Sequence, residues 1–377
     1  MKKFLFIKLL AVMTCFVSGG LLTGLAMADM DMKIFKTEET YAQEINKDGI
    51  TTNQGLPGEK QERIIISLVG DVLLAAGVGE AVAAYGPDYP WRDVAGVLRE
   101  SDLAVANLEC SISNRGDPEK DKQFTFRASP RVLKGIVNAG VDVLTLANNH
   151  VLDFGQAAML DTINFIRENK IAFTGAGLNE SEAATPVMLH KNGKKVAVLA
   201  FSRVIPRSAW IAGKNNPGLA SGHNYRLMMD RVKAVEKDAD ITIVSIHWGN
   251  ETDDFPDRKE VDLARMLVDA GADIVVGHHP HVLQGIEIYK GKVIAYSLGN
   301  FIFTISSIQK AREGAILQVT AGSDGSYKAR ILPTYVDNGT TRILRGNERK
   351  RVLDRIKYLS GPFKTTVDAK GDIQKLP

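Results

Sequence analysis

From residue 63 onward, short apolar runs alternate with longer segments of mixed polarity, and this alternation predicts strands and helices in turn. Apolar runs of four to seven residues are typical of buried strands, whereas longer segments with a regular polar side are typical of surface helices. The expected strands cover 64–69, 103–106, 141–147, 196–201, 241–246, 274–277 and 293–297. The expected helices cover 93–100, 130–139, 155–169, 225–237, 258–270 and 347–359, and a hairpin arm covers 186–195.

Three stretches share one order: the end of a helix, an acidic residue, an apolar strand, and then Asn or His. They are AGVDVLTLANNH (139–150), EKDADITIVSIHWG (236–249) and AGADIVVGHHPH (270–281). This rhythm has no fixed repeat length, and it predicts the α/β fold class with helical layers covering buried sheets. After residue 314, strand-like runs and a basic helix predict a sheet edge and its cover.

The first residues have a different pattern. Lys2 and Lys3 precede a long apolar run, and Ala26-Met27-Ala28 supplies an A-x-A cleavage pattern. We predict an export signal over residues 1–28, which is removed after Ala28 and directs the protein to the periplasm or cell surface. Retention of residues 4–25 as a membrane anchor is the alternative.

The remaining chain divides into three expected parts. Residues 29–62 are polar, lack an apolar period, and predict a linker. Residues 63–335 predict the main domain, and residues 336–377 a C-terminal extension of strands and helix. A hydrophobic content of 45% and a charged content of 24% are ordinary for a globular protein with a sizeable core.

Charge and cysteine content narrow the possible partners. Loss of Lys2, Lys3 and Lys8 with the export signal leaves 44 basic against 44 acidic residues. A mature chain without net charge or a basic block gives no electrostatic basis for nucleic-acid binding. Only Cys110 would remain after cleavage, so an internal disulfide is excluded.

Potential metal ligands follow the predicted strands. Five of the seven histidines lie there, whereas His190 and His223 occupy polar turns where exposure is expected. Oxygen and imidazole ligands without thiolate are typical of divalent-metal sites. Alternatively, each is a cap or a hydrogen-bonded loop residue. Together they predict a metal site at the rim of one sheet, formed by Asp71, Glu109, Asn149, His150, His247, His279 and His281.

Paired metal ions explain why these residue types would occur together. Two divalent cations about 3.5–4 Å apart need a bridging carboxylate and neutral ligands, and together they activate a water for attack on a phosphoryl group. Glu109 suits the bridge and Asn149 a neutral ligand. His150 is then free to protonate the leaving oxygen.

The ordered set of these motifs closely resembles the CapA proteins, which act in capsule and poly-γ-glutamate synthesis and form a branch of the calcineurin-like metallophosphoesterases. The resemblance covers about residues 63–305. The motifs that carry it are Gly70-Asp71, Asn107-Leu108-Glu109, Phe126-Arg127-Ala128, Ala147-Asn148-Asn149-His150 with Asp153 and Gly155, His247-Trp248-Gly249, Gly277-His278-His279-Pro280-His281 with Gln284, and Ser297-Leu298-Gly299-Asn300-Phe301.

The resemblance implies a four-layer α/β/β/α sandwich with a dinuclear site at one sheet rim. By motif, Asp71 and His281 resemble ligands of one metal, and Asn149, His247 and His279 ligands of the other. Glu109 resembles the bridge and His150 the catalytic histidine. The implied cofactors are one or two divalent ions (Mn, Zn or Fe).

One position departs from the wider superfamily, in which the first motif is Asp-x-His. Leu73 occupies the position of that histidine, so the first metal loses a nitrogen ligand. Asn107 is a candidate to compensate. His278 and Asn148 are expected to support the ligands from outside the first coordination sphere.

Two further residues have alternative interpretations. Arg127 would bind a phosphate or carboxylate of the substrate through its guanidinium fork, or form a surface salt bridge. Asp153 would orient His150, or cap the helix that follows.

Three functions remain open. The first is an exported metal-dependent hydrolase acting on a phosphoester or an anionic envelope polymer. The second is a non-catalytic accessory subunit that works with membrane-bound polymer synthase subunits. The third is hydrolysis of the polymer's amide bonds by the same site.

Overall fold

The computed structural model describes residues 63–377 except residue 338. The predicted export signal over 1–28, its alternative as an anchor, and the linker over 29–62 lie outside the described residues. The described chain belongs to one compact unit, Gln61–Pro377. Within it, no helix has the length and apolar character needed to cross a membrane.

The larger of the two main sheets has ten described strands in the order β19-β20-β17-β16-β1-β2-β5-β6, with β15 beside β1 and β18 beside β17. Strands β1, β2, β5 and β6 run parallel, and β16 joins β1 antiparallel. The strands are β1 (Ile64–Val72), β2 (Leu103–Leu108), β5 (Val143–Thr145), β6 (Ala172–Thr174), β15 (Asn300–Ile302), β16 (Glu313–Ala321), β17 (Tyr327–Asp337), β18 (Thr340–Ile343), β19 (Thr365–Val367) and β20 (Asp372–Lys375).

The smaller main sheet has the order β13-β14-β12-β11-β9-β8. Its strands are β8 (Val187–Lys191), β9 (Lys194–Ser202), β11 (Ile241–His247), β12 (Ile274–His278), β13 (Ile286–Tyr289) and β14 (Lys292–Ala295). The predicted hairpin arm is confirmed, because β8 and β9 pair antiparallel. Two short ladders, β3 (Ser111–Ile112) with β4 (Arg127–Ala128) and β7 (Ala176–Gly177) with β10 (Gly218–Leu219), complete the described strands.

The predicted helices are present within a few residues of their expected bounds. The described α-helices are α2 (Ala76–Tyr85), α3 (Ala95–Arg99), α4 (Leu133–Ala139), α5 (Gly155–Glu168), α6 (Glu180–Ala183), α7 (Tyr225–Glu236), α8 (Arg258–Asp269) and α9 (Gly346–Ser360). Helix α8 begins with a capping box, in which Asp257 and Glu260 each accept from the other's backbone N–H. Helix α2 was not predicted, because Gly77 and Gly79 break up its apolar pattern.

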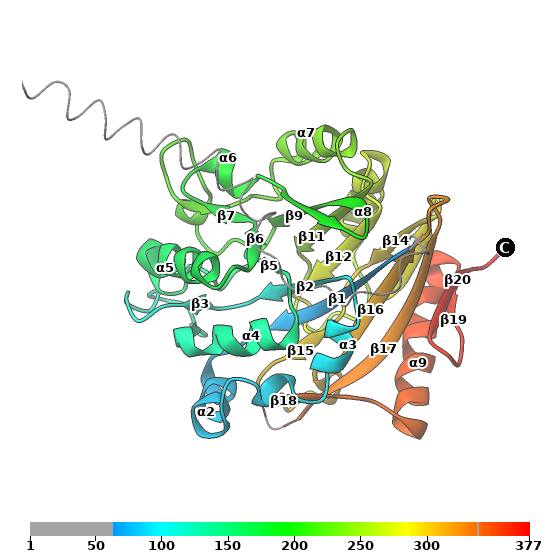
Figure 1. The fold of residues 1–377 in the computed structure, drawn as a ribbon, viewed down its shortest axis with the longest axis horizontal. Helices are drawn as coiled ribbons and strands as arrows, with labels where there is room; N and C mark the ends of the chain where they lie inside the picture. Colours follow the sequence, from blue (N-terminus) through cyan, green and yellow to red (C-terminus); the bar gives the residue numbers. More distant parts are fainter. Residues whose placement is uncertain (1–62, 338) are drawn as a thin grey trace, which may run out of the picture. The chain divides into compact units, whose positions relative to one another are not determined.

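Three apolar clusters define four layers. One lies between the two main sheets and joins residues such as Leu68 of β1 to Ile243 of β11. A second packs α2 to α5 on the outer face of the larger sheet, and a third packs α7 and α8 on the outer face of the smaller one. The α/β class and the α/β/β/α sandwich are thereby confirmed (Figure 1).

Helix α9 closes one end of this sandwich. Val352 and Ile356 on its inner side belong to the cluster between the sheets, and the helix contacts β13, β17 and β19 (Figure 1). The sheet interface also holds the carboxyl ends of β1, β2, β5, β11 and β12, where polar side chains are buried.

Candidate functional site

Glu109 is a buried carboxylate whose oxygens have no hydrogen-bond partner among the described residues. It follows β2 directly. Imidazole Nε2 atoms of His281, His247 and His150 lie 3.6, 3.7 and 4.0 Å from Oε1. Burial raises the pKa of Glu109 well above its usual value. A buried carboxylate without a hydrogen-bond donor is costly, and the imidazole nitrogens around Glu109 are typical ligands of a divalent cation.

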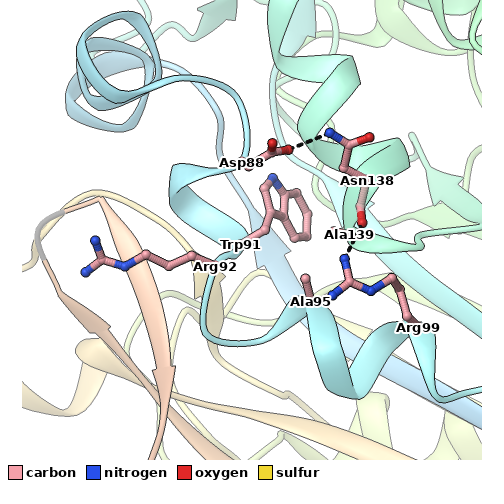
Figure 2. A pocket seen from close by; sticks show the side chains of 7 residues that line it. All are labelled: Asp88, Trp91, Arg92, Ala95, Arg99, Asn138 and Ala139. Carbon is pink, nitrogen blue, oxygen red and sulfur yellow. Dashed lines mark hydrogen bonds between the residues drawn. The ribbon is translucent and has the colours of Figure 1, made fainter.

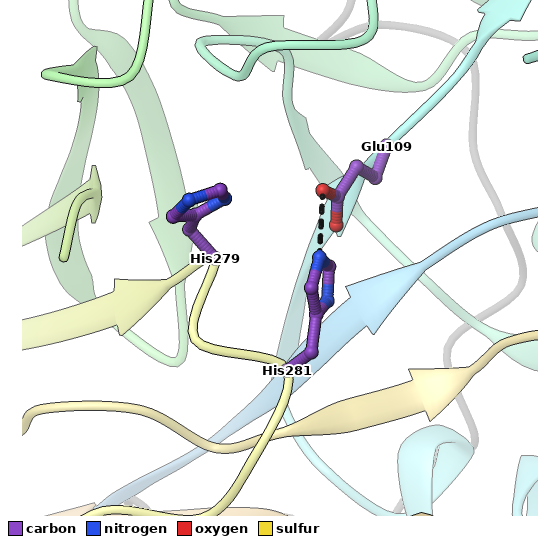
Figure 3. A group of neighbouring side chains, drawn as sticks. All are labelled: Glu109, His279 and His281. Carbon is purple, nitrogen blue, oxygen red and sulfur yellow. Dashed lines mark ion pairs between the residues drawn. The ribbon is translucent and has the colours of Figure 1, made fainter. Parts of the chain in front are cut away.

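His279 and His281 approach Glu109 from the loop after β12 (Figure 3). The ligand atoms of these three residues lie within 4.8 Å of one another, which makes them a candidate metal-binding group. His279 has φ 96° and His281 φ 57°. Left-handed backbone at non-glycine residues costs about 1–3 kcal/mol each and is concentrated at functional sites. Both histidines therefore have a strained backbone in the loop that brings their rings close to Glu109.

Asn149 and His247 extend the group on one side. His247 is the last residue of β11, and its Nε2 lies 2.9 Å from Asn149 Oδ1. Two atoms about 2.0–2.2 Å from a common ion and at right angles are about 3 Å apart, so this separation suits either a hydrogen bond or two ligands. Burial lowers the pKa of His247 well below its usual value, which keeps the ring neutral.

Asp71, on β1, lies on the other side of the group and, unlike Glu109, has polar partners on both carboxylate oxygens. Its Oδ1 accepts from Asn107 Nδ2 at 2.9 Å and contacts His278 Nδ1 at 3.1 Å. Its Oδ2 accepts from the His279 backbone N–H at 3.3 Å and faces His281 Nδ1 at 3.2 Å. Burial opposes ionisation, yet the hydrogen bonds from His278 and His281 hold the pKa of Asp71 well below its usual value.

The side chains of Asn107 and Asn148 form hydrogen bonds that connect Asp71 to the loop after β5. Besides its bond to Asp71, Asn107 accepts from Asn148 Nδ2 at 3.1 Å. Asn148 Oδ1 in turn accepts from the backbone N–H groups of His150 and Val151 at 3.0 and 3.1 Å. Asn148 thus holds the loop after β5. Asn107 Oδ1 also accepts from Thr145 Oγ1 at 3.3 Å, so this oxygen has no free lone pair with which to compensate for Leu73. Leu73 itself is buried in the apolar cluster under α2.

His150 is held by Asp153, with 2.7 Å between Nδ1 and Oδ2. Its ring packs 4.7 Å from that of Phe126, and burial lowers its pKa. Asp153 also accepts from the Phe126 backbone N–H at 2.7 Å. The N-cap residue of α5 is Phe154, which makes no side-chain cap, so Asp153 orients His150 rather than capping that helix.

Lys122 is a member of the site that the sequence analysis missed. Its ammonium group lies 2.9 Å from His150 Nδ1, contacts Asp153 Oδ1, and donates to the backbone carbonyl of Asn149. The side chain also lies over Trp210, with 5.4 Å between Nζ and the ring centroid. Its sequence neighbourhood, the polar stretch 114–123, is rich in lysine and acids and contains no signal that singles out one lysine.

Arg127 has structural contacts in this conformation. Its guanidinium donates to the carbonyls of Arg115 and Gly116 at 3.0 and 2.8 Å and lies 4.2 Å from the Phe154 ring centroid. These bonds hold the loop that leads to Lys122. Its expected contact with a substrate anion stays a prediction.

The site residues come from two sheets. Asp71, Glu109 and Asn149 follow or end strands of the larger sheet, and His247 and His279 those of the smaller one. The expectation of a single rim was therefore wrong. Alternating helices and strands predict parallel strands whose carboxyl ends lie at the same edge of a sheet. The pattern does not indicate which sheet each strand joins.

A cavity of about 370 Å³ lies elsewhere, on the outer side of the larger sheet (Figure 2). In it, Asn138 donates to Asp88 at 2.8 Å, and Arg99 donates to the Asn138 carbonyl at 3.0 Å. Its lining is separate from the residues around Glu109: Asp88, Trp91, Arg92, Ala95, Arg99, Asn138 and Ala139.

Comparison with known proteins places this geometry in a family. Residues 65–305 match the model of the bacterial capsule synthesis protein PGA_cap. The chain belongs to that family. The capsule biosynthesis protein CapA of Bacillus anthracis is 35% identical over 75% of this chain and 70% of its own length. The PGA biosynthesis protein CapA of Bacillus subtilis is 33% identical over 73% and 72%.

A further relative is a probable polyglutamine synthesis accessory protein of Mycobacterium tuberculosis, 32% identical over 68% of this chain and 70% of its own length. Among solved structures, a 5′-nucleotidase of Candida albicans aligns with a TM-score of 0.40 at 9% identity, over 81% of this chain and 59% of that one. The TT1561 protein of Thermus thermophilus aligns with a TM-score of 0.39 at 10% identity, over 68% and 98%.

Proposed function

We propose that this member of the PGA_cap family is a metal-dependent hydrolase of the phosphoesterase type. In this proposal it acts in the synthesis of capsule, poly-γ-glutamate or another anionic polymer of the cell envelope. The observation that carries the proposal is Glu109, a fully buried carboxylate that faces imidazole nitrogens and has no hydrogen-bond donor within the described chain.

Glu109, His279 and His281 would hold the cation, and His247 and Asn149 stand beside it as further ligands. The donor set of one carboxylate, imidazoles and an amide oxygen suits Mn, Zn or Fe. When bound, a divalent cation supplies Lewis-acid polarisation of the substrate and a water of lowered pKa.

His150 would supply a proton to the leaving oxygen. Its Nδ1 is fixed by Asp153 and Lys122, which turns Nε2 towards Glu109 at 4.0 Å. A substrate oxygen near Glu109 would therefore lie within reach of Nε2–H. Positioned proton donors of this kind contribute about 10²–10⁴-fold to rates.

The role in envelope-polymer synthesis is supported by the Bacillus relatives, whose names state capsule or PGA biosynthesis. The N-terminal pattern of Lys2, Lys3 and Ala26-Met27-Ala28 supports export, so that the site would act at the cell surface or in the periplasm. Membrane-bound polymer synthase subunits are the proposed partners.

Metal content and turnover test the proposal together. The purified protein is loaded with Mn²⁺, Zn²⁺ or Fe²⁺, its bound metal is counted, and phosphomonoesters and phosphodiesters are assayed. We expect bound metal and turnover in the wild type and the loss of both in Glu109→Gln. Glu168→Gln, an exposed residue of α5, is the matched control. A wild type that binds no metal and turns over no ester contradicts the proposal.

A second candidate is a non-catalytic accessory role in the polymer machinery. It is favoured by the name of the Mycobacterium relative and by Leu73, which removes one ligand of the superfamily's first metal. Cells carrying Glu109→Gln separate the two functions. Normal polymer output from these cells favours the accessory role, and lost output favours catalysis.

The third function, cleavage of amide bonds within the polymer, would use the same residues. Incubating poly-γ-glutamate with the metal-loaded protein and measuring chain length tests it. Shortening by the wild type but not by Glu109→Gln would favour amide hydrolysis over ester hydrolysis.

A further inference from the structure

We propose that this chain holds a single divalent ion, ligated through Glu109, and that Asp71 orients the surrounding histidines instead of ligating a second ion. The inference rests on the proposed function, because it presupposes that the site binds metal. It differs from the dinuclear arrangement implied by the sequence motifs.

The contrast between two buried carboxylates carries the argument. Asp71 and Glu109 are both fully buried and lie at the ends of the neighbouring strands β1 and β2. Each oxygen of Asp71 has two nitrogen partners within 3.3 Å, whereas both oxygens of Glu109 lack a hydrogen-bond partner within the described residues. Of the two carboxylates, Glu109 is therefore the one whose lone pairs are left for a cation.

His281 connects the two carboxylates and shows what Asp71 does. Its Nδ1 faces Asp71 Oδ2 at 3.2 Å and Asn300 Oδ1 at 2.9 Å, so its Nε2 points to Glu109 at 3.6 Å (Figure 3). A carboxylate on one nitrogen of an imidazole commonly fixes the ring whose other nitrogen binds metal. Asp71 and Asn300 are thus positioning residues for His281.

An ion beside Asp71 would have to displace hydrogen bonds that already hold the surrounding nitrogen atoms. Leu73, at the position of the expected histidine, packs in the apolar cluster, and both ends of the Asn107 amide are hydrogen-bonded. Ligation by Asp71 would also displace Asn107 Nδ2 and the His279 backbone N–H. Each buried donor left unpaired costs about 1–3 kcal/mol, which opposes a second ion.

Manganese binding counts the ions directly. The wild-type protein is titrated with Mn²⁺, bound metal is measured after gel filtration, and the electron paramagnetic resonance spectrum is recorded. We expect one ion per chain with the hyperfine pattern of an isolated Mn²⁺. Two ions about 3.5–4 Å apart would be magnetically coupled. Two bound ions with a coupled spectrum would overturn the inference and leave the proposed function intact.

Two amide substitutions separate the roles of the carboxylates. Asp71→Asn is expected to keep a stoichiometry of one ion and to bind Mn²⁺ about 10–100-fold more weakly, the usual cost of losing a ligand's outer partner. Glu109→Gln is expected to bind no Mn²⁺. Circular dichroism checks that both variants fold. An Asp71→Asn variant that folds and binds no Mn²⁺, as in Glu109→Gln, would overturn the inference.

The wild-type measurement keeps the test decisive if Asp71→Asn does not fold, because the count of ions and the spectrum need no variant. A wild type without bound Mn²⁺, Zn²⁺ or Fe²⁺ overturns both this inference and the proposed function. A wild type with two ions overturns this inference alone.

Discussion

At the scale of single residues, the site depends on how buried charges are partnered. Asp71 and Glu109 are equally buried, but hydrogen bonds compensate only Asp71. Burial accordingly raises the pKa of Glu109, while hydrogen bonds lower that of Asp71 against the effect of burial. Without a bound cation, we expect burial of the Glu109 carboxylate to lower the free energy of unfolding, and we expect a bound cation to offset this cost.

Glu109→Gln should separate folding stability from metal binding. Without metal, we expect the variant to unfold at the same temperature as the wild type or higher, because an amide costs less to bury than a carboxylate. At a Mn²⁺ concentration roughly 100 times Kd, the wild type should gain about 2.7 kcal/mol and the variant nothing. Thermal unfolding with and without Mn²⁺ measures both effects. An equal gain in the two proteins would show that Mn²⁺ binds elsewhere.

Lys122→Met should lower turnover without removing metal. Lys122 contacts His150 and Asp153, so its loss should misplace the imidazole and reduce kcat about tenfold or more, with little change in KM. Lys120→Met, an exposed neighbour in the same loop, is the control and should behave as the wild type. Steady-state kinetics and metal counts measure the effects. A loss of bound metal equal to the loss of kcat would assign Lys122 to loop structure instead.

At the scale of elements, contacts connect helix α9 to the loop that carries the candidate metal ligands His279 and His281. Arg355 donates to Glu313 at 2.8 Å and to Asp254 at 2.9 Å. Lys310 donates to Asp254 and to the Thr252 carbonyl, and the Thr252 backbone N–H donates to the Pro280 carbonyl. Backbone strain at His279 and His281 persists only if surrounding structure maintains it, and we expect these contacts to contribute.

Arg355→Met should therefore weaken Mn²⁺ binding, although it lies outside the segment matched by the family model. We expect a decrease of up to about tenfold, the lower end of the range for residues that support ligands. Arg351→Met is the matched control, because Arg351 also pairs with Glu313 and has no bond to Asp254 in the described chain. Calorimetric titration with Mn²⁺ compares them. Equally weakened Mn²⁺ binding in both variants would show that the effect comes from the contact with Glu313 and would contradict a role for the Arg355–Asp254 contact.

At the scale of the whole molecule, the packing of two sheets against each other creates the site. The apolar cluster between the sheets brings β2 within reach of β11 and β12, so that Glu109 meets His247 and His279. Strand β16 lies between β1 and β17 in the larger sheet, and α9 covers the end of the interface. The segment after residue 305 therefore belongs to the same core as the ligands.

A fragment of residues 63–305 should fail to fold, although it contains every expected metal ligand. Removing β16 and β17 leaves β1 with an unpaired edge and exposes the cluster between the sheets. We expect this fragment to be aggregated or molten, and residues 63–377 to unfold cooperatively. Circular dichroism and thermal unfolding compare the two. A cooperative transition in the short fragment would contradict the expected role of these strands.

Much of the local structure follows from sequence pattern, because strand and helix periods are local properties of the chain. The strand that becomes β11 and the helices that become α5, α7 and α8 were predicted within one or two residues. Helix α2 was missed because its glycines hide the period. Clustering of Asp, Glu, Asn and His after successive strands was likewise readable, since the carboxyl ends of parallel strands share one edge of a sheet.

Which distant side chains form hydrogen bonds or ion pairs with one another is determined by the tertiary structure. The sequence indicates the types and order of the candidate metal ligands. It does not indicate that their strands belong to two different sheets. Nor could the chain alone reveal that Asp71 is satisfied, that Glu109 is left without a donor, or that Lys122 reaches His150. These differences arise from contacts between segments far apart in sequence, and such contacts form only when the two sheets pack.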